Sequence, residues 1–182
     1  MKLVREHINE KFTEDSDPVA DMEIGSKYLI HKWFKSVGVD RSRYTIDDNL
    51  NIEVKGSLDL RRTSITKLPD NLRVGGLLDL RGTQITKLPD NLSVGGSLYL
   101  GGTQITKLPD NLKVGGSLYL QGTSIIKLPD NLSVGESLDL EGTFITKLPD
   151  NLRVNFHLYL RGTQITELPK SLKVKGQIFK DF

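Results

Sequence analysis

Residues 91–110 read NLSVGGSLYLGGTQITKLPD, and close variants of this 20-residue unit follow one another along most of the chain. Six of the seven prolines lie twenty residues apart, at positions 69, 89, 109, 129, 149 and 169. A fixed period of this length is typical of a solenoid, in which each repeat forms one coil that packs on the next. The sequence therefore predicts stacked coils, with six full units at 51–170 and a truncated unit at 171–182.

Apolar residues alternate with polar or small residues inside each unit, and in the unit at 71–90 they are Leu72, Val74, Leu78, Leu80, Ile85 and Leu88. This alternation predicts extended chain with one face directed inward. Glycine pairs such as Gly95-Gly96 permit a tight bend or a close approach of two backbones. The Pro-Asp-Asn at each boundary between units favours a turn. One coil buries too little apolar surface to offset the cost of ordering it, so the coils must stack to be stable.

The run from Leu98 to Pro109 resembles the LxLxxNxLxxLP core of leucine-rich repeats in their short, 20-residue bacterial form. The resemblance implies an α/β-type repeat solenoid, right-handed and β-rich, with a mostly extended convex side. Two departures are the glycine that precedes the LxL segment, as at Gly75, and the threonine in the place of the ladder asparagine. These inward threonines are expected to form a thinner polar ladder, and they are Thr63, Thr83, Thr103, Thr123, Thr143 and Thr163.

The two ends of the chain differ from the repeat. Residues 1–43 read as helical, first around Leu3–Phe12 and then in an aromatic stretch that contains Trp33. A solenoid needs a terminal cap over the apolar cross-section of its first coil. We therefore predict an N-terminal helical cap at 1–43 and the solenoid at 44–182, with a separate binding or targeting module as the alternative to the cap. In the truncated unit, the lysines are expected to blunt an exposed sheet edge, and they are Lys173, Lys175 and Lys180.

The first residues of the chain, up to Pro18, together with the segment that begins at Tyr44, are similar to the openings of uncharacterised tailed-bacteriophage leucine-rich repeat proteins. This second resemblance implies the cytoplasm of a host cell as the setting. The sequence itself favours a cytoplasmic protein, because its start lacks the pattern of a signal peptide and it has no apolar run long enough for a membrane span.

Composition and motifs argue against catalysis and against a bound cofactor or metal. Cysteine is absent, so disulfides, thiolate chemistry and cysteine-based metal sites are excluded. The three histidines are scattered, and the aspartates between Asp15 and Asp21 lack the glycine and the final glutamate of a calcium loop. The formal net charge of +2 is too small to predict a nucleic-acid partner. We expect neither an enzyme nor a nucleic-acid or membrane-binding protein.

Stacking converts every repeat position into a column of side chains along the solenoid. The outward positions of the LxL segments would line the concave face of a leucine-rich repeat solenoid, and they include Asp59, Asp79, Tyr99, Tyr119, Asp139 and Tyr159, with Arg61, Arg81 and Arg161. Tyrosine and arginine are frequent at the energetic centres of protein interfaces. Tyr99 stacked on Tyr119, with Asp79 and Asp139 on either side, is the preferred binding patch. Ordinary cross-strand pairing explains the same residues equally well.

Two other columns carry weaker indications. Lysines at 67, 87, 107, 127 and 147 run beside aspartates three residues further on, and the two rows are expected to neutralise each other. A second threonine column, at positions 66, 86, 106, 146 and 166, leaves ice binding as a remote alternative. Our main hypothesis is a non-catalytic protein–protein interaction module that binds a protein or peptide through its concave face and is monomeric. A structural, self-assembling component, for example of a phage particle, associated end to end, is the alternative from another class.

Overall fold

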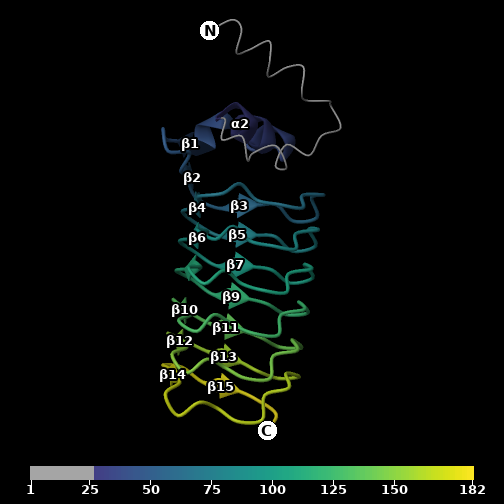
Figure 1. Cartoon of the computed structure of the whole chain (residues 1–182), viewed down its shortest axis with the longest axis vertical. Helices are drawn as coiled ribbons and strands as arrows, with labels where there is room; N and C mark the ends of the chain where they lie inside the picture. Colours follow the sequence, from purple (N-terminus) through teal and green to yellow (C-terminus); the bar gives the residue numbers. More distant parts are fainter. Residues whose placement is uncertain (1–26) are drawn as a thin grey trace, which may run out of the picture.

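A computed structural model describes residues Lys27–Phe182, so the helix predicted around Leu3–Phe12 and the aspartates between Asp15 and Asp21 lie outside the described residues. The chain forms a β-solenoid of about six turns with one short α-helix before it. The helix is α2 (Lys27–Ser36), and a 3-10 turn, η2 (Arg41–Arg43), follows it. Successive coils pile up along the long axis of the molecule, with α2 at the N-terminal end of the stack (Figure 1).

Each coil contributes one short strand to each of two sheets. The eight-stranded sheet has the order β1 (Tyr44–Ile46), β2 (Ile52–Val54), β4 (Leu72–Val74), β6 (Ser93–Val94), β8 (Lys113–Val114), β10 (Ser133–Val134), β12 (Arg153–Val154), β14 (Lys173–Val174). The seven-stranded sheet has the order β3 (Leu58–Asp59), β5 (Leu78–Asp79), β7 (Leu98–Tyr99), β9 (Leu118–Tyr119), β11 (Leu138–Asp139), β13 (Leu158–Tyr159), β15 (Ile178–Phe179). Neighbouring strands are parallel, apart from the antiparallel pair β1 and β2. Residues twenty apart pair with each other, as Leu98 does with Leu118.

The stacked 20-residue coils confirm the solenoid, but the α/β form of the leucine-rich repeat is not confirmed. Between residues 44 and 182 the coils contain strands and turns and no helix. The side where we expected extended convex chain includes a second parallel sheet, formed by β2 and its neighbours. Each coil bends between its two strands, which lets both strands pair with the next coil, and a glycine pair stands at this bend in the coils that begin at residues 71, 91 and 111.

In the middle coils, this bend packs so closely against the preceding coil that glycine is required there. A Cβ atom at Gly95 would lie 2.3 Å from the carbonyl oxygen of Gly75, and one at Gly115 would lie 2.3 Å from that of Gly95. Both distances are far inside van der Waals contact, and the atoms they involve are backbone atoms that cannot move aside. The same approach allows the Gly95 N–H to donate to the Val74 carbonyl at 2.8 Å. The repeated glycines therefore set how closely the coils can stack on this side.

The core is a single column of aliphatic side chains inside the coils. The six apolar positions of the repeat are almost fully buried, as in Leu72, Leu78, Leu80, Ile85 and Leu88, each at most 1% exposed. One buried cluster extends from Ile30 in α2 to Ile165 in the last full coil. The inward face predicted from the alternation is confirmed by this burial, and each coil adds its apolar residues to those of the coils beside it.

The inward threonines, which we expected to form a polar ladder, use their hydroxyl protons within their own coils. Each Thr Oγ1 donates to the carbonyl of the leucine three residues earlier in its own coil, as Thr103 does to Leu100 at 2.7 Å. The same bond is present for Thr63, Thr83, Thr123, Thr143 and Thr163. A hydroxyl has one proton to donate, so these residues close a turn within each coil. The threonine side chains stabilise the turn that follows the LxL strand.

Serine provides the polar ladder that joins one coil to the next. The Ser97 hydroxyl accepts the Ser117 backbone N–H at 3.0 Å, and the Ser117 hydroxyl accepts that of Ser137 at 3.2 Å. Ser57 does the same for Leu77, and Ser137 does the same for His157. The serines stand in one column of the repeat at a spacing of twenty residues, with Leu77 and His157 at two of its positions, and this spacing is the signal by which the ladder could have been predicted.

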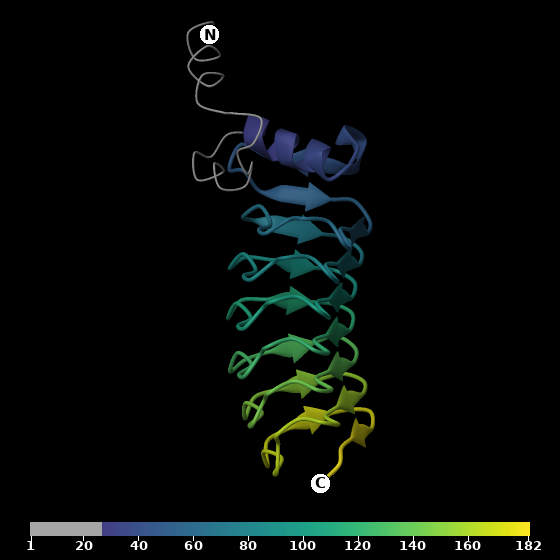
Figure 2. The same ribbon diagram turned by 90° about the vertical axis from the view of Figure 1, so that its right-hand side faces the viewer.

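The helix α2 lies across the end of the first coil (Figure 2). Its apolar residues Ile30, Trp33 and Phe34 are buried in the same cluster as the coils. The Phe34 ring stacks on Tyr44 with 3.9 Å between the ring centres, and Tyr44 begins the antiparallel strand β1. The only tryptophan of the chain is thus used in packing over the first coil.

We predict that Gly115→Ala lowers the free energy of unfolding by about 2–3 kcal/mol, because the added methyl group must displace the Gly95 backbone. The matched control is Gly101→Ala, since a Cβ there meets no atom closer than 3.4 Å. Urea denaturation followed by far-UV circular dichroism compares the two variants. Equal stability of the two variants would show that the glycine column does not limit the stacking.

Candidate protein-binding face on the seven-stranded sheet

One column of side chains runs down the outer face of the seven-stranded sheet. The strand register stacks Asp59, Asp79, Tyr99, Tyr119, Asp139, Tyr159 and Phe179 in this order. Each follows a leucine or isoleucine that points into the core, so the period of two directs the column residues outward. We missed Phe179 because it belongs to the truncated unit. Its place twenty residues after Tyr159 is the signal that could have identified it.

Aromatic rings stack at two places in this column. Tyr99 and Tyr119 are parallel within 9°, with 4.4 Å between their ring centres, as the sequence predicted. Tyr159 and Phe179 form a second stack at 4.8 Å and 6°. Such pairs contribute about 0.5–1.5 kcal/mol beyond the burial of their area. All four rings remain partly exposed, so each stack offers an ordered aromatic surface to solvent.

Two arginines, each two residues after an aspartate of the column, lie beside its N-terminal part. Arg81 donates two hydrogen bonds to the carboxylate of Asp79, from Nη2 at 2.6 Å and from Nε at 3.0 Å. Its guanidinium also lies 4.8 Å from the centre of the Tyr99 ring. Arg61 binds Asp59 in the same bidentate way and reaches to within 3.5 Å of Asp79. The hydrogen bonds from Arg61 lower the pKa of the Asp59 carboxyl below its ordinary value.

Asp139 is the other buried acid of the column, and its surroundings are different. The Asp139 residue is only 8% exposed. Its carboxylate accepts a hydrogen bond from the Glu141 backbone N–H at 3.0 Å and another from the side-chain amide of Gln121. Within Lys27–Phe182, no lysine, arginine or histidine lies within 4.0 Å of its carboxylate. Burial raises the pKa of the Asp139 carboxyl above its ordinary value.

Arg161 is the last of the outward residues that the sequence predicted for the concave face. Its guanidinium lies 5.9 Å from the centre of the Phe179 ring, one coil further toward the C-terminus. The structure therefore brings Asp79, Arg81, Tyr99 and Tyr119 into one continuous contact, and it places Arg161 in a second group at the other end of the sheet. Between the two groups lies Asp139.

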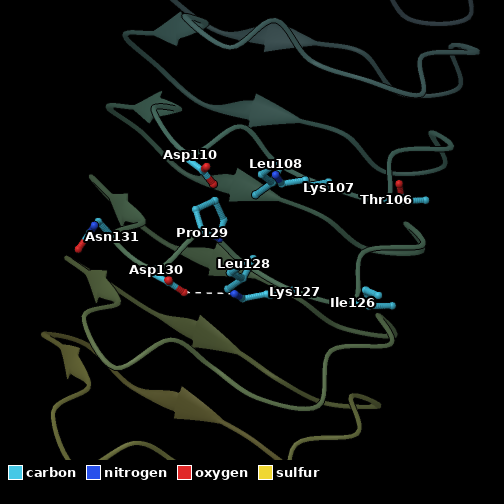
Figure 3. Close-up of a pocket in the computed structure, with 10 residues that line it drawn as sticks. All are labelled: Thr106, Lys107, Leu108, Asp110, Ile126, Lys127, Leu128, Pro129, Asp130 and Asn131. Carbon is cyan, nitrogen blue, oxygen red and sulfur yellow. Dashed lines mark ion pairs between the residues drawn. The ribbon is translucent and has the colours of Figure 1, made fainter.

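The lysine and aspartate rows lie on the side of the coils that has no sheet. The expected pairing is present in one coil, where Lys127 Nζ lies 3.5 Å from the Asp130 carboxylate, and no other pair of these rows in the described coils comes within 4.0 Å. A hollow between two coils is located here, lined by Thr106, Leu108, Ile126, Lys127 and Asp130 among others (Figure 3). Similar hollows recur between other coils along this side. Because they follow the repeat, they are a property of the coil shape and do not single out one position.

Within residues 27–182, these surfaces include neither a group of metal-binding side chains nor a membrane-spanning helix. Residues 27–182 contain no group of three or more acidic or histidine side chains arranged to hold a metal ion. No helix of this part of the chain has the length and apolar character needed to span a membrane. No protein-family model matches the chain, and no curated protein matches it significantly.

The raised pKa of Asp139 predicts a pH dependence of stability. Because the fold disfavours the charged carboxylate, this group stabilises the protein most at pH below the unfolded pKa of about 3.9, and that contribution is lost as the pH rises through the folded pKa. We expect Asp139→Asn to raise the melting temperature at pH 7, with a gain that shrinks toward pH 4. Thermal unfolding of variant and parent at both pH values measures this difference.

Asp59→Asn is the control, because the lowered pKa of Asp59 gives the opposite sign. The native contribution of Asp59 is present above its unfolded pKa and is lost as the pH falls through its lowered folded pKa. This variant should therefore melt below the parent at pH 7, and the gap should close in acid. A gain at pH 7 from both substitutions would mean that removing negative charge in general, and not the burial of Asp139, stabilises the protein.

Proposed function

We propose that this chain is a non-catalytic protein-binding module of the leucine-rich repeat type that uses the outer face of its seven-stranded sheet. The observation that carries the proposal is the column in which the partly exposed rings of Tyr99 and Tyr119 stack on each other while Arg81 lies over the first of them. Rings held in this way have already lost their rotational freedom. Binding a partner therefore costs less side-chain entropy than it would for free tyrosines.

The outer faces of the two sheets differ in a way that supports this choice. On the eight-stranded sheet the outward residues of the coils are charged or small, as in Arg73, Ser93, Lys113 and Ser133. Aromatic side chains and arginine dominate the centres of protein interfaces, whereas lysine and serine are depleted there. The outward column of the seven-stranded sheet contains four aromatic residues, and the outward residues of the coils on the eight-stranded sheet include none.

The size of the face limits the kind of partner. Six coil intervals at the strand spacing extend about 29 Å, and a strand segment of five residues extends about 17 Å, which together make roughly 500 Å². A standard interface buries about 800 Å² on each partner. The face is therefore suited to an extended peptide segment or to one small domain.

We predict that the double variant Tyr99→Ala, Tyr119→Ala loses at least about tenfold in affinity for the protein partner, because removing two central aromatic anchors costs more than about 1.4 kcal/mol. Its melting temperature should fall by only about 2–4 °C, since the lost stack is worth about 1 kcal/mol. Affinity capture from a lysate of the source cell with the parent and the variant, followed by mass spectrometry and titration of the captured protein, measures the loss.

The matched control is Lys113→Ala on the outer face of the eight-stranded sheet, which should leave the capture unchanged. If the partner binds the tyrosine variant as well as it binds the parent, the assignment of the binding face is wrong. If Lys113→Ala abolishes binding, the opposite sheet is the binding surface.

A further inference from the structure

The protein already contains one completed site for an arginine side chain on this face. The buried carboxylate of Asp79 receives the guanidinium of Arg81 through two bonds at 2.6 and 3.0 Å. The same guanidinium lies over the ring of Tyr99, which is paired with Asp79 in the next coil. Asp79 Oδ1 also accepts the backbone N–H of Arg81 at 3.1 Å, which orients the carboxylate. A buried acid and a tyrosine of the following coil are thus sufficient to hold a guanidinium here.

The same arrangement recurs three coils later without its arginine. Asp139 has the strand position of Asp79, and it is paired with Tyr159 as Asp79 is paired with Tyr99. Asp139 Oδ1 accepts the backbone N–H of the second residue after it, at 3.0 Å, so the carboxylate is oriented in the same way. That second residue is Glu141, where the earlier coil has Arg81. The acid, its orientation and the ring are present, and the cation is replaced by an anion.

Among the described residues, the Asp139 carboxylate has no counter-ion in the protein alone, which is energetically unfavourable. The Asp139 residue is 8% exposed, and no cationic group lies within 4.0 Å of the carboxylate of Asp139 or of Glu141 in the described coils. Arg161 does not fill the place, because its guanidinium lies over Phe179. A buried carboxylate without a counter-ion bears a desolvation cost that an incoming cation would remove.

An aromatic residue flanks Asp139 on each side. Tyr119 and Tyr159 are its partners in the two neighbouring strands, from coils about 9.6 Å apart at twice the strand spacing. Tyr159 has the place beside Asp139 that Tyr99, the ring under Arg81, has beside Asp79. Gln121 bonds Asp139 from the position that Arg61 has beside Asp79, and Arg61 does not prevent Arg81 from binding. Gln121 can therefore remain in place when a guanidinium enters.

We propose that Asp139, Glu141 and Tyr159 form a seat for an arginine side chain from an extended segment of the bound protein. This inference rests on the proposed protein-binding role of the face and names the chemistry that one position of it recognises. Arginine fits better than lysine because its planar fork pairs with a carboxylate through two bonds while its flat face lies on a ring. Citrulline has the same shape without the charge and should not bind.

Titration of the ¹⁵N-labelled protein with acetyl-Gly-Arg-Gly-amide tests the seat directly, with the lysine and citrulline peptides as matched probes. We expect saturable shifts of the Asp139, Glu141 and Tyr159 backbone amides, with affinity for the lysine peptide at least fivefold weaker and no saturation by the citrulline peptide. Equal binding of the arginine and lysine peptides, or shifts that avoid these three residues, would overturn the proposal.

Two substitutions sharpen the test. Glu141→Arg rebuilds the Asp79–Arg81 arrangement within the chain, so it should raise the melting temperature and abolish binding of the arginine peptide. Asp139→Asn should weaken that binding at least tenfold, whereas Asp90→Asn, at an exposed acid on the side of the coils that has no sheet, should leave it unchanged. Unchanged peptide affinity in Glu141→Arg with a native-like spectrum would show that the arginine binds elsewhere.

The peptide titration and the capture experiment fail separately. If the tyrosine variant loses the partner but the arginine peptide does not bind, the face binds protein and the seat is wrong. If the peptide binds at Asp139 while the tyrosine variant keeps its partner, the seat is supported and the role proposed for the Tyr99–Tyr119 stack is wrong.

Discussion

Backbone hydrogen bonding between successive coils is the constraint on which the rest of this structure depends. Each coil pairs with the next on two sides, and on one of these sides the backbones of the middle coils approach so closely that only glycine fits at the point of contact, as at Gly95 and Gly115. A methyl group there would push the coils apart, and the inward leucines would then lose contact with those of the next coil. The buried column from Ile30 to Ile165 therefore follows from how closely the backbones approach.

Because the coils stack in register, differences in sequence between the repeats appear as differences along each surface column. Where neighbouring units have the same residue type, the column becomes regular, as in the serine ladder or the Tyr99–Tyr119 stack. Where one repeat has a different residue type at a position, that side chain lies among neighbours that interact with another residue type in the other coils. Glu141 is such a departure, because it has the repeat position of Arg81, which binds the buried Asp79 in an earlier coil.

Sequence reasoning was most accurate for positions and less accurate for partners. It predicted the inward leucines, the outward column and the contact of Tyr99 with Tyr119, because these follow from a period of two within coils and of twenty between them. It assigned the coil-to-coil ladder to threonine, whereas threonine bonds within its coil and serine joins the coils. The direction of a hydroxyl depends on local turn geometry, which the order of residues does not reveal. The second sheet was missed for a similar reason, since pairing of β4 with β6 requires the bend at the glycines.

By itself, the sequence determined that the chain repeats, how many coils it makes and which residues share a column, because a solenoid places residues twenty apart above one another. Only the tertiary structure decided which charges are compensated. Asp79 and Asp139 have the same place in the repeat, yet one is covered by Arg81 and the other has no counter-ion among the described residues. Burial and distance decide whether a carboxylate is satisfied, and both arise only when separate coils come into contact.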